Sequence, residues 1–283
     1  MKFMLAFGAL ALTLLPIRFS ADEASVESVA QKASCQSHVE YVADSKMALL
    51  AGPIDTCMSK QFVNAAKNND IELVLMSSSG GNIEAAMEIG RTIKANGYPL
   101  ALSGACFSSC AQYVLPAADR VLMDDTTILG LHGTASSRQK IIGARLHEKS
   151  QMAFVTSLAL KEQDYYAEMG LQPASLFNAH EKISMSCVNN LYNSGQQTGI
   201  AFKRPHNLYV PRFEDIEAEF NVQFFGPRPA SDADYQQRLE GARSGHDFKE
   251  LYFWEDAPTI ALDQIPDCSD VKTGGRQTLA ALR

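Results

Sequence analysis

Three short segments between residues 72 and 133 carry groups suited to acyl-transfer chemistry. The first ends in the run Ser77 to Gly81, the second contains Ser108 and Ser109, and the third places His132 between Leu131 and Gly133. A serine beside a histidine base can attack a carbonyl carbon, and backbone N–H groups can stabilise the oxyanion that forms. The segments therefore predict an oxyanion loop, a nucleophile and a base.

Alternating strands and helices must bring these segments together. The apolar run 71–76 is typical of a buried parallel strand, and the glycines after it permit a tight turn with exposed N–H groups. Apolar residues recur at helical spacing across 82–96, and a second strand over 99–103 leads to the serines. A helix from Ser109 through Leu115 would direct its positive end toward the serine.

The histidine follows after two further steps of strand and loop. We expect a strand over 120–123, and 126–131 then leads directly into His132. Two such steps can return the chain to the same rim of a sheet, so the serine and the histidine are expected to meet there.

This order of Ser-Gly-Gly, helix, strand, Gly-x-x-x-Ser, helix, strand and His resembles the Clp-protease/crotonase superfamily, and its secreted, periplasmic ClpP-like serine protease branch in particular. The resemblance covers roughly residues 45–200 and implies an α/β fold with a repeated β-β-α superhelical core. A serine flanked by two cysteines is typical of that branch, and here it is Ser108, between Cys106 and Cys110, rather than Ser109.

The resemblance also implies roles for individual residues. Ser108 falls on the nucleophile and His132 on the general base, while the N–H groups of Gly80 or Gly81 and of Ser109 fall on the oxyanion hole. The family pattern places an acid in 181–190, where the sequence has no aspartate and only Glu181 as a carboxylate.

Three interpretations of this departure stay open, besides an inactive site: Glu181 replaces the aspartate, the Asn189 amide orients the histidine, or Ser108 and His132 work as a dyad. Each candidate residue also has a structural role that would explain its presence without catalysis. Ser108 could cap its helix, His132 could be a core histidine, Glu181 could be solvated, and the two glycines would be needed by the turn even in an inactive relative.

Six cysteines stand at positions 35, 57, 106, 110, 187 and 268, an even number that permits full pairing in an oxidising compartment. Their connectivity cannot be deduced from the sequence. Cys106 and Cys110 are close enough for a bridge that would stiffen the nucleophile turn, and the alternative is that they are two small buried hydrophobic residues.

The chain divides into four expected parts. Residues 1–21 have the positive start and apolar run of a secretory signal, although an uncleaved anchor is an alternative. A lead-in over 22–44 precedes the Clp-like domain at 45–200. A loop-rich C-terminal extension over 201–283 contains scattered prolines. We therefore expect export to the periplasm or beyond.

The charge and composition of the chain limit the classes of partner that we expect it to bind. The net charge of −7 and pI near 5.4 argue against nucleic acid or an anionic membrane surface. The histidines show no metal-ligand spacing, so we expect no metal and no cofactor. The superfamily resemblance implies a homo-oligomer, and an exported location makes an ATPase partner unexpected.

The sequence thus predicts an exported ClpP-like serine hydrolase, a peptidase acting without ATP on short or unfolded peptides. One alternative is a catalytically silent binding or assembly protein that has lost the triad acid. A second is an acyl-thioester enzyme of the crotonase kind, for which exported compartments offer little coenzyme A.

Overall fold

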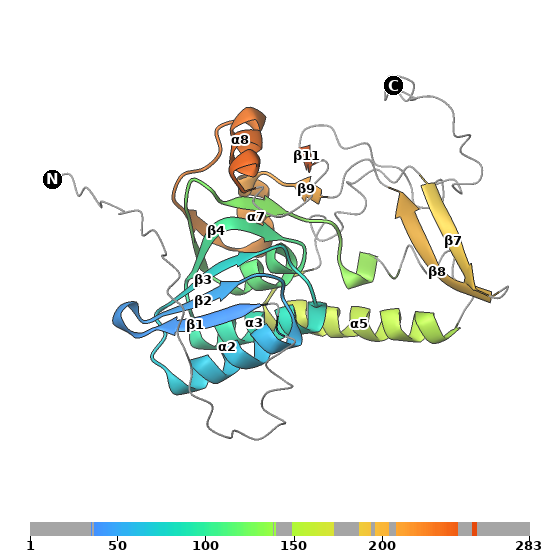
Figure 1. Ribbon diagram of the computed structural model, residues 1–283, viewed down its shortest axis with the longest axis horizontal. Coiled ribbons are helices and arrows are strands. Elements are labelled where there is room, and N and C mark those ends of the chain that lie inside the picture. The colour runs from blue at the N-terminus through green and yellow to red at the C-terminus, as the bar shows by residue number, and fades with distance from the viewer. Residues whose placement is uncertain are drawn as a thin grey trace, which may run out of the picture. The chain divides into compact units, whose positions relative to one another are not determined.

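A seven-stranded sheet dominates the computed structural model, which describes residues 35, 37–137, 139, 149–172, 187–193, 196–203, 208–242 and 251–253 (Figure 1). Its strands follow the order β1-β2-β3-β4-β5-β10, with β6 paired to β4. Their bounds are β1 His38–Val42, β2 Met47–Ala51, β3 Leu73–Ser78, β4 Leu100–Phe107, β5 Arg120–Met123, β6 Ile128–Gly130 and β10 Gln223–Phe225.

Parallel pairing prevails in this sheet. Only β1 and β2 pair antiparallel, and every other pair is parallel. The strands alternate with helices α2 (Thr56–Asn68) and α3 (Ile83–Asn96), which lie along the same side of β1 to β4 (Figure 1). The predicted α/β class with a mainly parallel sheet is therefore confirmed.

Strand β4 changes partner along its length. Its first residues, Leu100–Leu102, pair with β5, whereas Ala105–Phe107 pair with β6. The register with β3 also shifts, between Met76 and Ser78. Because of this change the end of β4 lies between the glycine turn after β3 and the strand that leads to His132.

Local signals explain the helix boundaries. The Asp55 side chain accepts the Met58 N–H at the start of α2, and the Asn82 side chain accepts the Ala85 N–H at the start of α3. Gly97 ends α3 in the left-handed conformation, which glycine adopts readily.

The helix expected after the serines has an unexpected form. Cys110–Val114 is a π-helix and Leu115–Ala117 a 3-10 turn, in place of one α-helix. Tyr166 and Tyr165 donate their hydroxyls to carbonyls of this π-helix. These tyrosines belong to α5 (Lys149–Glu168), too distant in sequence to be foreseen.

Segments beyond residue 200 complete the sheet. Strand β10 adds to β5 at its edge, and β9 (Leu208–Val210) pairs with β11 (Leu251–Phe253). Helix α7 (Phe213–Phe220) lies between β9 and β10 in the chain, and α8 (Asp232–Ala242) lies between β10 and β11. The rings of Phe224 and Tyr235 both contact that of Phe213. The predicted extension therefore supplies regular elements to the main body.

Strands β7 (Cys187–Asn193) and β8 (Gln196–Lys203) pair antiparallel as a two-stranded sheet. The predicted signal at 1–21 lies outside the described residues. Within the described ranges, none of the helices is long and apolar enough to span a bilayer, and no three His, Cys, Asp or Glu side chains are grouped as metal ligands.

Candidate active site

Ser108 occupies a sharp turn between β4 and the π-helix. Its backbone φ is +54°, a left-handed conformation that non-glycine residues rarely adopt. The Ser108 N–H donates to the Gly130 carbonyl at 2.8 Å, and the Ser108 carbonyl accepts the Gln112 N–H at 2.9 Å. The turn is thus tied to β6 on one side and to the π-helix on the other.

The glycine turn after β3 packs directly against Ser108. Gly80 has φ +89°, and a Cβ at this position would lie 2.6 Å from both the Phe107 carbonyl oxygen and the Ser108 Cβ. At Gly81 a Cβ would lie 2.1 Å from the Ile54 carbonyl oxygen. Both positions therefore require glycine because the backbone of another segment fills the space.

A disulfide closes the nucleophile turn. The structure joins Cys106 to Cys110, and both cysteines are fully buried. A second disulfide joins Cys35 to Cys57. The first bridge corresponds to the one considered from the sequence, while Cys268 lies outside the described residues.

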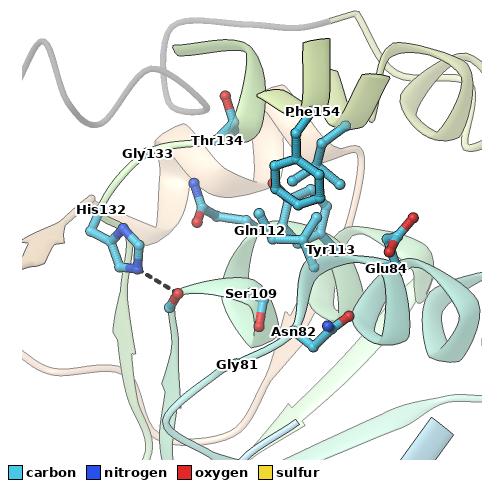
Figure 2. Close-up of a pocket in the computed structure, with 13 residues that line it drawn as sticks. Gly81, Asn82, Glu84, Ser109, Gln112, Tyr113, His132, Gly133, Thr134 and Phe154 are labelled. Carbon is cyan, nitrogen blue, oxygen red and sulfur yellow. Dashed lines mark hydrogen bonds between the residues drawn. The ribbon is translucent and has the colours of Figure 1, made fainter. Parts of the chain in front are cut away.

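The structure brings His132 to Ser108. Ser108 Oγ and His132 Nε2 are 2.5 Å apart, the contact drawn as a dashed line in Figure 2. The preceding residue, Leu131, exchanges two backbone hydrogen bonds with Tyr209 of β9, at 2.7 and 2.6 Å. A segment from beyond residue 200 thereby fixes the approach of the histidine.

The two glycines differ in whether their backbone N–H groups are available as hydrogen-bond donors. The Gly80 N–H donates to Ser78 Oγ at 3.0 Å, so it is already engaged. Within the described residues the N–H groups of Gly81 and Ser109 make no hydrogen bond, and both residues line the pocket beside Ser108. Of the three predicted donors, Gly81 and Ser109 are therefore the available pair.

Glu162 of α5 joins the histidine loop to the nucleophile's helix, a role that no pattern in the sequence predicts. It is buried and accepts the Tyr113 hydroxyl at 2.5 Å, the Ala135 N–H at 2.7 Å and the Ser136 N–H at 3.0 Å. A buried carboxylate needs such donors to offset its lost hydration. The segment after His132 is thus bonded to the element after Ser108.

Two neighbouring tyrosines of α5 act as neutral donors. Burial raises the pKa of both Tyr165 and Tyr166 above the usual value for tyrosine. The Tyr166 hydroxyl donates to the Gln112 carbonyl at 3.1 Å, and the Tyr165 hydroxyl donates to the Tyr113 carbonyl. These bonds satisfy carbonyls of the π-helix and connect it to α5.

A pocket of about 340 Å³ opens beside Ser108 and His132. Figure 2 shows Phe154 of α5 above it and Glu84 of α3 at the end away from His132. Lys161 pairs with Glu84 at 2.5 Å and partly offsets its charge. Apolar side chains form much of the lining, namely those of Ile83, Tyr113, Phe154 and Leu158.

The proposed third member is not located. Glu181 lies outside the described residues, and Asn189 lies in β7. The interpretations of the missing aspartate consequently stay predictions.

Comparisons with known proteins find similarity in the backbone and not in the sequence. No family model matches the chain, and neither does any curated protein. Among solved structures, the backbone is similar to a mutant of ClpP1 from Listeria monocytogenes, at 16% identity and a TM-score of 0.38. That match covers 71% of this chain and 97% of the other. At this TM-score the likeness carries no inference about activity, which must come from the geometry of the site.

Proposed function

We propose that this protein is an exported serine hydrolase of the ClpP-like kind, acting as a peptidase on short or unfolded peptides without ATP. The observation that carries the proposal is the 2.5 Å contact between Ser108 Oγ and His132 Nε2, made by a serine held at φ +54° on a strand-to-helix turn. Serine nucleophiles of α/β hydrolases occupy a strained turn of this type.

Each group has one step in the proposed reaction. Ser108 Oγ attacks the carbonyl carbon of the scissile bond, and its proton passes to His132 Nε2. The negative charge that develops on the carbonyl oxygen is stabilised by the Gly81 and Ser109 N–H groups. His132 then returns the proton to the leaving amine, and water, deprotonated by the same histidine, hydrolyses the acyl-enzyme.

The pocket supports a peptide substrate. Apolar walls formed by Ile83, Phe154 and Leu158 stand beside the serine and can receive one side chain. Phe154 is 68% exposed, so its ring is accessible to a side chain bound in the pocket. Export is proposed from the N-terminal sequence and from the two disulfides, which persist in oxidising compartments.

Labelling by a fluorophosphonate probe tests the proposal, because the probe requires an activated serine and no knowledge of the substrate. The purified wild type is compared with Ser108→Ala, His132→Ala and the control Ser157→Ala, whose serine is exposed on α5. We expect labelling of the wild type and the control, and its loss in the other two variants.

A folded wild type that takes no label would reject the hydrolase and favour the silent binding protein. Labelling that survives Ser108→Ala would place the nucleophile elsewhere. Cleavage of a peptide library by the labelled protein would then separate a peptidase from other hydrolases.

A further inference from the structure

Gln112 carries a buried amide that the proposed reaction does not use. The residue is 1% exposed, and its Nε2 has no hydrogen-bond partner within the described part of the chain. Buried amide donors are almost always paired, since an unpaired one loses its hydration without compensation. The side chain also lines the pocket beside Ser108 and His132.

The amide faces the interior of that pocket. Figure 2 shows it between His132 and Phe154, next to the segment of Gly133 and Thr134. This is the side of the pocket that Ser108 and His132 also line.

The backbone of Gln112 is held from both directions. Its N–H donates to the Ser108 carbonyl, and its carbonyl accepts the Tyr166 hydroxyl at 3.1 Å. These bonds fix the π-helix relative to the nucleophile turn and to α5. The amide is thus presented at a defined position, as recognition of a polar ligand group requires.

The charged residues that line the pocket indicate which kind of hydrogen-bond acceptor a ligand can present to Gln112. Its lining contains no lysine or arginine in the described residues, and its one carboxylate, Glu84, is paired with Lys161. Among the described lining residues, a carboxylate ligand would find no lysine or arginine to offset its lost hydration. An uncharged carbonyl oxygen loses far less hydration free energy on burial, and it can accept a hydrogen bond from the Gln112 Nε2 amide group.

We propose that Gln112 determines specificity, by donating from Nε2 to the uncharged carbonyl of an amide-ended substrate side chain, glutamine or asparagine, bound in the pocket beside Ser108. The inference rests on the proposed function and deepens it. The apolar walls accommodate the methylene part of such a side chain, and Gln112 accepts its polar end as a partner.

Two peptide aldehydes of the same leading sequence test this assignment. One ends in N,N-dimethylglutaminal, whose amide only accepts hydrogen bonds, and the other in norleucinal, which has no acceptor. Binding is measured as protection of Ser108 from the fluorophosphonate probe. The variants are Gln112→Met and Gln112→Leu, with Gln163→Leu as a matched change at an exposed glutamine of α5.

The wild type and Gln163→Leu should bind the amide aldehyde about tenfold more tightly than norleucinal, as one net hydrogen bond between neutral groups allows. Gln112→Met and Gln112→Leu should lose this preference and keep their affinity for norleucinal, which also shows that they fold.

An unchanged preference in both Gln112 variants, or a wild type that favours norleucinal or binds neither aldehyde, would overturn the inference while leaving the hydrolase intact. Failure of the probe to label wild-type Ser108 would instead reject the proposed function itself, and the inference with it.

Discussion

The two halves of the candidate site are held by different means. Around Ser108 itself, the constraints come from residues close in sequence or from the adjacent strands, namely the Cys106–Cys110 bridge and the Gly80 contact, and α5 reaches only the π-helix that follows the turn. Around His132 they come from distant segments, because β9 bonds to Leu131 and Glu162 bonds to Ala135 and Ser136.

Different parts of the sequence therefore position Ser108 and His132. The nucleophile turn depends on local chemistry and steric contact, so changes there should act directly on the serine. The histidine loop depends on packing from α5 and from beyond residue 200, so changes far from the site should misplace it. The predictions below test this division, beginning with the largest expected effect.

Gly80→Ala should abolish labelling and cost about 3 kcal/mol or more of unfolding free energy, because the new Cβ would overlap the backbone at Phe107. Gly97→Ala is the matched control, since Gly97 also has positive φ but no atom lies within 4 Å of its Cβ. It should cost about 1 kcal/mol and retain labelling. Urea unfolding and labelling rates are measured for both variants. Equal losses of unfolding free energy in the two would show that the contact between Gly80 and the Ser108 turn is unimportant.

Glu162→Gln should slow labelling about ten- to hundredfold, since a buried acceptor of three hydrogen bonds loses its charge and one of its acceptor oxygens. Asp164→Asn makes the same chemical change at an exposed position of α5 and should have little effect. The measurement is the second-order rate of labelling at a temperature where both variants are folded. A Glu162→Gln protein of reduced stability but normal labelling rate would contradict the proposed link to His132.

Replacing Cys106 and Cys110 together with alanine should lower the unfolding free energy by about 2 kcal/mol, as expected for a very short closed loop. It should also slow labelling, because the nucleophile turn loses its bridge. The corresponding double replacement of Cys35 and Cys57 should destabilise without affecting the labelling rate of the folded protein. Mass mapping of a non-reduced digest checks the pairing first, and free thiols at 106 and 110 would remove the basis of the prediction.

Asp124→Asn should have the smallest effect, well under about 1 kcal/mol, because the side chain is partly exposed and screened. Burial alone would raise the Asp124 pKa, but hydrogen bonds from Ser103, Thr126 and Thr127 outweigh it and hold the pKa below its usual value. The stability from this group is present above about pH 4 and is lost as pH falls through the folded pKa. Acid unfolding should therefore be shallower in the variant, and identical curves would refute this role.

The sequence predicts the parts of the site that depend on local pattern. The glycine turn, the strand before Ser108 and the α3 helix follow from apolar periodicity and capping residues, and the structure has them within a few residues of the expected bounds. Ser108 and His132 also follow from the motifs, and the structure places them in contact.

The remaining features depend on contacts between distant residues. A buried Glu162 cannot be distinguished by sequence from the exposed Glu168 of the same helix, because both occupy a helical pattern of mixed character. The π-helix likewise depends on hydroxyls from Tyr165 and Tyr166. The sequence also could not show that the Gly80 N–H is already bonded, because this depends on the position of the Ser78 hydroxyl.

Strand β10 has a consequence for the order in which the molecule can assemble. It pairs in parallel with β5, and β9 anchors Leu131, although both strands come from the late part of the chain. Pairings between residues so far apart form slowly and cannot form before the later residues have been synthesised. A nascent polypeptide that ends before β9 (Leu208–Val210) thus lacks the strand that bonds to Leu131, and one that ends before β10 (Gln223–Phe225) lacks the edge strand beside β5. Under the proposed function, the protein would therefore gain hydrolytic competence only after these late strands have been synthesised.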